Sequence, residues 1–233
     1  MTIIVKMKKY RCPNARLPGK LYRIHHPESR TTYSENGGFL AADNTKIYNE
    51  DSEEEFKQDI VRQFSWDYRG PLPFISLFSE REHAENWGLK EPWQGQRPYP
   101  VTKQWTLFTI NTEVLEDAVF FSLKELVEDQ QVQIPDAAKQ HIHGAYICLH
   151  RIPAAAINDQ TNPNQVLLDR DDRYWERKAA QLDYDYLDGS YDSEREALQE
   201  NWNTIIEKKI EDACKRRGST LKYTLHCISN IVD

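Results

Sequence analysis

Residues 145–153 read Ala-Tyr-Ile-Cys-Leu-His-Arg-Ile-Pro. This apolar run predicts a strand over residues 145–152 that stops at Pro153, because proline has no backbone N–H to donate to a neighbouring strand. Three further apolar runs upstream predict strands at residues 20–25 (KLYRIH), 72–78 (LPFISLF) and 104–111 (QWTLFTIN).

Helical patterns separate these strands. Phe56, Ile60 and Phe64 share one face of a predicted helix over residues 49–66, and a capping-box pattern predicts a second helix from Ser79 to about Trp87. Short strands interleaved with helices, without regular β-α-β spacing, indicate an α+β fold. The remaining predicted elements are a helix over 113–128, an Asp- and Tyr-rich stretch over 169–193, a helix over 194–217 and a last strand over 220–228.

Composition narrows the classes of function. The 233 residues carry a net charge of −7, which disfavours general attraction to nucleic acid or to an anionic membrane. The N-terminus lacks the apolar segment of a signal peptide, and no run of about 18 apolar residues occurs, so we expect a cytoplasmic protein, with delivery into another cell left open. Four scattered cysteines indicate free thiols rather than zinc ligands or disulfides: Cys12, Cys148, Cys214 and Cys227.

Three segments carry candidate binding chemistry. Arg23 lies on the first predicted strand, and Gly37-Gly38 follows it by fourteen residues. A guanidinium group beside a glycine bend can clamp a diphosphate, although a lone arginine more often forms a surface salt bridge. Ser76, inside an apolar strand, can orient a carboxylate, or its hydroxyl can simply bond to nearby backbone. The third segment is the strand that ends at Pro153.

The order and spacing of these segments resemble the R-S-E branch of the ADP-ribosyltransferase family, which includes cholera toxin and the heat-labile enterotoxins. In that family a first strand reads L-Y-R, a G-G-hydrophobic bend follows, a second strand reads aromatic-hydrophobic-Ser-Thr-Ser, and a third strand runs into Ile-Pro. The chain is also similar to a fungal group with L-Y-R-h-H, F-I-S-L-F-S-x-R-E-H-A-E-N-W and E-Y-L-x-L-H-R-I-P. The likeness covers residues 21–157 discontinuously, and Leu77 and Phe78 stand in place of the Thr-Ser.

The resemblance implies a fold and a substrate. NAD would lie across a split between two small β-sheets with flanking helices. Arg23 would hold a phosphate or ribose of NAD, and the backbone near Gly38, within the bend Gly37-Gly38-Phe39, would bond the nicotinamide amide. Ser76 would position the catalytic glutamate.

Alanine occupies the position of that glutamate. Counting back eight residues from Pro153 gives Ala145, so the third motif reads His143-Gly144-Ala145. The family's glutamate supplies a negative charge beside the positive charge that develops as nicotinamide leaves, and alanine carries neither a charge nor an acceptor. Either the natural residue is glutamate and this chain carries an inactivating substitution, or the domain is a natural pseudoenzyme. His143 stands at the position that helps to choose the acceptor, so a protein or a nucleobase acceptor remains open.

We therefore expect a toxin- or effector-like, NAD-dependent mono-ADP-ribosyltransferase, inactive in this chain. The alternatives are a non-catalytic module that binds NAD or ADP-ribose, an NAD glycohydrolase and, disfavoured by the acidic balance, an RNA 2′-phosphotransferase. The NAD-binding core is expected over residues 1–160, with a helix and strand extension over 161–233 packed on it.

Two histidine pairs have their own alternatives. His25-His26, beside Arg23, either contacts the adenine side of a nucleotide or is a plain loop pair. His141 and His143 lie two residues apart and could face one metal ion, but the pattern offers no third ligand, so no metal site is expected.

Overall fold

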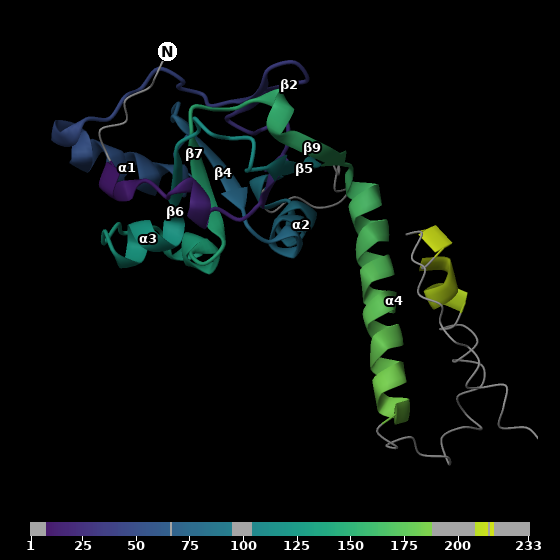
Figure 1. Cartoon of the computed structure of the whole chain (residues 1–233). Helices are drawn as coiled ribbons and strands as arrows, with labels where there is room; N and C mark the ends of the chain where they lie inside the picture. Colours follow the sequence, from purple (N-terminus) through teal and green to yellow (C-terminus); the bar gives the residue numbers. More distant parts are fainter. Residues whose placement is uncertain (1–7, 66, 95–103, 188–207, 214, 217–233) are drawn as a thin grey trace, which may run out of the picture. The chain divides into compact units, whose positions relative to one another are not determined.

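A computed structural model describes residues 8–65, 67–94, 104–187, 208–213 and 215–216 (Figure 1). The chain forms two compact units, Met1–Pro163 and Asn164–Asp233. Among the described residues, no helix has both the length and the apolar character needed to cross a membrane.

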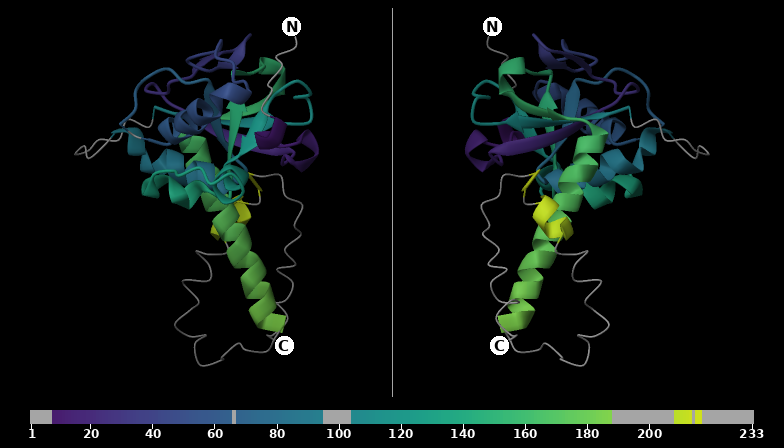
Figure 2. Two further views of the ribbon diagram at one scale, coloured as in Figure 1. Left: turned by 90° about the vertical axis from the view of Figure 1, so that its left-hand side faces the viewer. Right: turned by 90° about the vertical axis from the view of Figure 1, so that its right-hand side faces the viewer.

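The first unit contains two antiparallel sheets, which Figure 2 shows from two further directions. The larger sheet has six strands in the order β6-β7-β4-β1-β5-β9, and the smaller has three in the order β2-β3-β8. The larger comprises β1 (Lys20–His25), β4 (Phe74–Phe78), β5 (Thr106–Asn111), β6 (Phe120–Ser122), β7 (Ala145–Leu149) and β9 (Ile157–Thr161). The smaller comprises β2 (Thr32–Ser34), β3 (Gly38–Leu40) and β8 (Arg151–Ile152).

Helices complete an α+β architecture, so the predicted fold class is confirmed. The first unit has three α-helices among its described residues: α1 (Glu53–Gln63), α2 (Arg81–Lys90) and α3 (Leu123–Glu128). Its short 3₁₀ turns are η1 (Lys8–Tyr10), η2 (Asn14–Arg16), η3 (Glu50–Ser52), η4 (Pro92–Gln94), η5 (Asp136–His141) and η6 (Ala154–Ala156). The second unit contains α4 (Pro163–Leu187) and a helical segment within residues 208–216.

Apolar side chains cover both faces of the larger sheet, which explains why its central strands read as continuous apolar runs. On β4, Phe74 belongs to the cluster that contains Phe56 of α1 and Leu126 of α3. The next residue, Ile75, belongs to the opposite cluster, which contains Phe39 of the smaller sheet. The larger sheet is therefore packed between helices on one face and the smaller sheet on the other.

The strand predicted over residues 145–152 is two strands. β7 pairs with β4 in the larger sheet, whereas Ile152 of β8 pairs with Phe39 in the smaller one. Between them His150 has a positive φ of 63°, a conformation that histidine tolerates better than most residues with a Cβ. The chain thus changes sheets at His150, which the apolar pattern alone does not reveal.

Other boundaries also differ from the prediction. The helix expected over 113–128 exists only as α3, because Phe120–Ser122 pair with β7 as strand β6. The expected cap at Ser79 is wrong: α2 begins at Arg81, and the Ser79 N–H donates to the Gly144 carbonyl at 2.8 Å. The sequence did not predict β2, the polar edge strand β9 or the helical state of residues 169–187 in α4.

The remaining predictions concern the cysteines and the C-terminal segment. Cys12 and Cys148 are buried free thiols, as predicted. The predicted helix over 194–217 is helical where it is described, within residues 208–216. Cys214, Cys227 and the strand predicted over 220–228 lie outside the described residues.

Charges on the second unit also pair locally. Arg216 Nε donates to Asp172 Oδ1 at 2.9 Å, and Lys209 Nζ lies 5.2 Å from the centre of the Trp175 ring.

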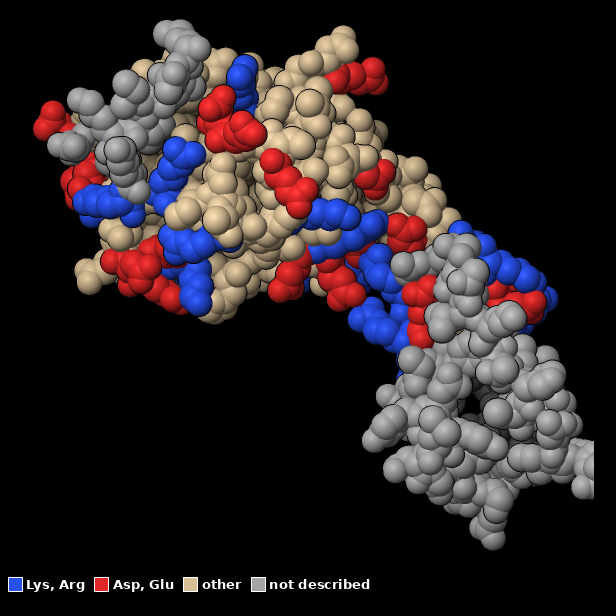
Figure 3. All heavy atoms as spheres, in the orientation of Figure 1, with Lys and Arg blue, Asp and Glu red and all other residues tan. Residues whose placement is uncertain are grey.

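On the face of the first unit visible in Figure 3, the described acidic and basic side chains are interspersed and form no broad area of one sign.

Gly38 generates a stability prediction. Its φ is 77°, and a Cβ there would lie 2.1 Å from the Ile152 carbonyl oxygen. We expect Gly38→Ala to lower the free energy of unfolding by about 2 kcal/mol or more, because both the backbone strain and the clash oppose it. Gly37→Ala is the matched control, since its Cβ would meet only the Ser34 hydroxyl at 2.7 Å, which can rotate away. Urea unfolding of both variants tests this, and equal losses would contradict it.

Candidate functional site

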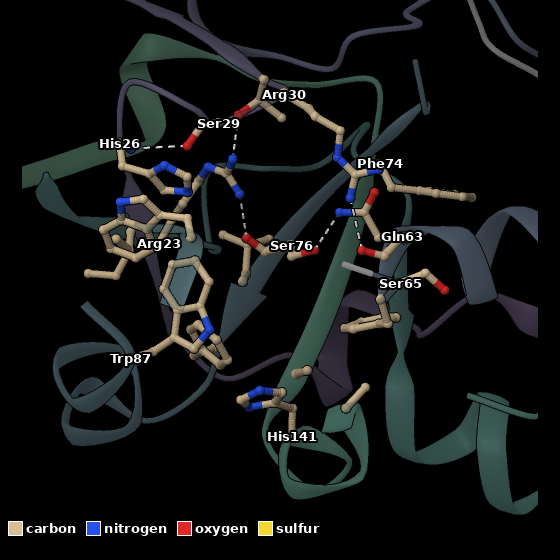
Figure 4. A pocket seen from close by; sticks show the side chains of 18 of the residues that line it. Arg23, His26, Ser29, Arg30, Gln63, Ser65, Phe74, Ser76, Trp87 and His141 are labelled. Carbon is tan, nitrogen blue, oxygen red and sulfur yellow. Dashed lines mark hydrogen bonds between the residues drawn. The ribbon is translucent and has the colours of Figure 1, made fainter. Parts of the chain in front are cut away.

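One cavity of about 430 Å³ brings together the three positions that the motifs singled out (Figure 4). Arg23 from β1, Ser76 from β4 and Ala145 from β7 all line it, and these three strands are neighbours in the larger sheet. β1 and β5 pair from Lys20 to His25, whereas β1 and β4 pair in register at Tyr22 and Phe78. A volume of this size is within the range of small-molecule sites.

Arg23 is buried, with 7% of its surface exposed. Its Nη1 donates to the Ser76 carbonyl at 2.7 Å, and its Nη2 donates to the Thr31 hydroxyl. The guanidinium carbon lies 5.2 Å from the centre of the Phe39 ring, and Nε has no hydrogen-bond partner. Within the described residues no carboxylate forms an ion pair with Arg23, so the alternative of a surface salt bridge is wrong.

Burial, followed by the nearby charge of Arg30, lowers the pKa of Arg23 to about 10. Both causes oppose the cation, yet the group stays protonated at neutral pH. The site therefore holds a desolvated positive charge. The hydrogen bonds of this guanidinium group go only to uncharged oxygens, those of the Ser76 carbonyl and the Thr31 hydroxyl. An anion placed here would gain strong, charge-assisted hydrogen bonds.

A second polar group reaches the cavity from the C-terminal end of α1. Gln63 Nε2 donates to the Ser76 hydroxyl at 2.7 Å, and the Gln63 carbonyl accepts from Arg30 Nη2 at 3.0 Å. Ser76 thus links the two arginines (Figure 4). Its carbonyl accepts from Arg23, and its hydroxyl accepts from the side chain of Gln63, whose backbone carbonyl accepts from Arg30. The hydroxyl that was expected to position a glutamate binds a carboxamide instead.

Aromatic rings form another part of the lining. His26 stacks on Trp93 with ring centres 4.0 Å apart and planes 8° from parallel, and Trp87 lies 4.8 Å from Trp93. The His26 side chain is 9% exposed, and its Nδ1 is buried without a partner. Of the two adjacent histidines, His26 lines the cavity, whereas the His25 ring contacts those of Phe39 and Phe108.

Ala145 begins β7 and pairs with Phe78 of β4. It is 2% exposed and lines the cavity beside His141. His141 Nδ1 lies 2.7 Å from His83 Nε2, and burial lowers the pKa of His141 to about 4. Ala145 therefore contributes only a methyl group to the lining.

Other predicted site residues lie outside the lining. His143 is exposed and is not among the cavity residues, and in the described part of the chain no group of three metal ligands occurs. Gly37, Gly38 and Phe39 do not line the cavity either. Gly38 packs against the backbone of Ile152. The Phe39 ring contacts the Arg23 guanidinium group but is not itself part of the cavity lining.

Several lining residues were not assigned a role from the sequence. Gln63, Arg69, Trp93 and His141 come from a helix end, a loop and two 3₁₀ turns, and no local motif surrounds them. Arg30 lies seven residues after Arg23, and the sequence assigned no function to it. The only signal that could have found these residues is the three-dimensional convergence itself.

The chain matches the family described as "Domain of unknown function (DUF7587)" over residues 16–166. It belongs to this family. The match spans β1 to β9, so the DUF7587 domain contains both sheets and the whole cavity lining. No curated protein matches the chain, and no solved structure does.

The cavity of this DUF7587 domain combines the buried guanidinium group of Arg23 and the half-buried one of Arg30 with a stacked aromatic lining. Guanidinium groups bind phosphate or carboxylate oxygens through paired N–H donors. Aromatic faces bind flat rings by stacking. The lining therefore suits a ligand that has both an anionic group and a planar ring.

The buried His26 predicts a pH dependence of stability. Burial, followed by the charges of Arg23 and His25, lowers the pKa of His26 to about 3, below the value of 6.5 expected when unfolded. Because the unfolded chain then binds more protons between these values, stability falls as the pH falls through this window. We expect His26 to account for a loss of about 2 kcal/mol between pH 7 and pH 4.5.

Urea unfolding at a series of pH values measures this loss. His26→Phe keeps a flat ring against Trp93 and removes the titrating group, so its stability should fall less steeply with acidification. His25 and His141 titrate in the same direction in both proteins, so the difference between the two curves isolates His26. Parallel curves would refute the prediction.

Proposed function

We propose that this protein is an ADP-ribosyltransferase-like domain that binds NAD or ADP-ribose in the cavity. We further propose that, with alanine at position 145, it binds the nucleotide without transferring ADP-ribose to a macromolecular acceptor. The observation that carries the proposal is the convergence of Arg23, Ser76 and Ala145 on one cavity from three neighbouring strands.

The donor set of the cavity fits the anionic part of such a nucleotide. Arg23 Nε is a buried N–H donor without a partner. A buried donor that lacks an acceptor costs free energy, and a diphosphate oxygen would remove that cost. Arg23 also lacks a carboxylate partner in the described structure, so an entering anion has no internal competitor there.

The aromatic part of the lining fits the rings of the nucleotide. Trp87, Trp93 and His26 are mutually in contact, with His26 and Trp93 almost parallel. Adenine and nicotinamide are flat rings of the kind that stack on such surfaces. His26 Nδ1 adds one polar atom without a partner beside this surface.

The acidic residues of the cavity support binding without transfer. Glu28 is the one carboxylate among the described lining residues, and it is exposed. In the resembled family, a carboxylate at position 145 would face the ribose whose bond to nicotinamide breaks. The methyl group of Ala145 provides no charge to stabilise that step.

Nucleotide binding is tested by titration calorimetry with NAD and with ADP-ribose. We expect binding by the unmodified protein and at least a tenfold weaker affinity for Arg23→Ala, because charge-assisted hydrogen bonds are lost. Lys20→Ala is the control, since it removes one positive charge from the exposed start of the same strand. Thermal melting checks that both variants fold, and failure of both nucleotides to bind the unmodified protein would refute the proposal.

The role of position 145 is tested by Ala145→Glu, with Ala145→Gln as a control of similar size and no charge. We expect the unmodified protein and the glutamine variant to release no nicotinamide from NAD, and the glutamate variant to release it. In hydrolysis, the bond from the ribose carbon to the nicotinamide nitrogen breaks, a water oxygen bonds to that carbon, and one proton is released.

Labelled NAD separates the possible activities of Ala145→Glu. Label on a protein or nucleic acid indicates transfer, and free ADP-ribose without a labelled acceptor indicates an NAD glycohydrolase. Nucleotide binding with neither product indicates a non-catalytic binding module. That third result would contradict the transferase ancestry while leaving the binding proposal intact.

A further inference from the structure

The cavity contains a second cationic group that NAD binding at Arg23 leaves unused. Arg30 lines the part of the cavity near the C-terminal end of α1, where it bonds to the Gln63 backbone carbonyl, and Arg69 lines the same cavity. In Figure 4 the Arg23 and Arg30 guanidinium groups lie on opposite sides of Ser76. One nucleotide could therefore present different anionic groups to the two arginines.

Arg30 is held in place by a neutral partner. Its Nη2 donates to the Gln63 carbonyl at 3.0 Å, and its Nη1 is buried with no hydrogen-bond partner. In the described part of the chain no carboxylate forms an ion pair with it. The side chain is thus fixed in one position while its charge remains uncompensated, which is the state of an arginine prepared for an anion.

Charges around Arg30 increase this demand. Arg69 is exposed at the cavity lining, and its charge, added to burial, lowers the pKa of Arg30. The positive charge of Arg30 in turn lowers the pKa of Arg23, because the two cations repel each other. Against the charges of Arg23 and Arg30 the described lining offers one carboxylate, the exposed Glu28, which forms no ion pair with any residue described.

A diphosphate does not match this arrangement fully. It carries two negative charges in one compact group, whereas the guanidinium groups of the buried Arg23 and the half-buried Arg30 lie on opposite sides of Ser76. A phosphate monoester on the adenosine ribose adds a charge of about −1.5 to −2 at a separate point of the same molecule. Arginine is the residue that commonly accommodates such a 2′-phosphate.

We propose that Arg30, assisted by Arg69, forms a phosphate-monoester subsite, so that the cavity prefers NADP to NAD. The inference rests on the proposed nucleotide binding and names the class of nucleotide: a dinucleotide with a further phosphate on its adenosine ribose. Arg23 receives the diphosphate and Arg30 the monoester.

Titration calorimetry with NADP and NAD at one ionic strength tests the subsite. We expect NADP to bind the unmodified protein at least tenfold more tightly than NAD, consistent with a charge-assisted contact. Arg30→Gln should reduce this ratio to threefold or less while changing the affinity for NAD by less than threefold. Arg30→Lys keeps the charge and should retain part of the preference. Arg151→Gln, which removes an exposed arginine outside the cavity, should leave the ratio unchanged.

The outcomes separate this inference from the proposed function. Equal affinities for NADP and NAD in the unmodified protein would overturn the subsite and leave nucleotide binding standing. A preference for NADP that persists in a folded Arg30→Gln variant would overturn the assignment to Arg30. If neither nucleotide binds, the proposed function fails, and the subsite fails with it. Thermal melting of each variant shows that a changed ratio is not a loss of folding.

Discussion

The passage of the chain from one sheet to the other at His150 constrains everything around the cavity. The His150 N–H donates to the Pro73 carbonyl at 2.8 Å, and its own carbonyl accepts from the Ala41 N–H at 2.7 Å. Its ring Nε2 lies 2.7 Å from the Lys46 carbonyl oxygen. These contacts hold a left-handed residue in place, so that Ala145 stays in the larger sheet and Ile152 reaches the smaller one.

The cavity that results is electrostatically unfavourable without a ligand. Arg23 and Arg30 are anchored by the Ser76 and Gln63 carbonyls, which accept hydrogen bonds but carry no net charge. Such contacts offset the desolvation of a guanidinium group less completely than a carboxylate would. An external anion would compensate these charges more fully than the two carbonyls do.

The residues proposed to bind the nucleotide and the position proposed to stabilise charge during the reaction lie on different elements. The groups suited to hold an anionic nucleotide lie on β1, on the loop after it and at the end of α1, whereas the position suited to charge stabilisation lies at the start of β7. Ala145 contributes only a methyl group, so the cationic and aromatic lining does not depend on a charge at this position. The Ser76 hydroxyl has a partner within the chain, because it accepts a hydrogen bond from Gln63 Nε2.

Sequence alone determined the α+β class, the strand at Lys20–His25 and the core of β4, because local apolar runs and turn residues encode these features. It also singled out Arg23, Ser76 and Ala145, since each lies in a motif of recognisable order. It could not divide residues 145–152 at His150 or find strand β6, because pairing with distant strands overrides local propensity. Only the tertiary structure decided that Gln63, Arg30 and Trp93 join these residues, because hydrogen bonds and stacking between separate segments leave no periodic signal along the chain.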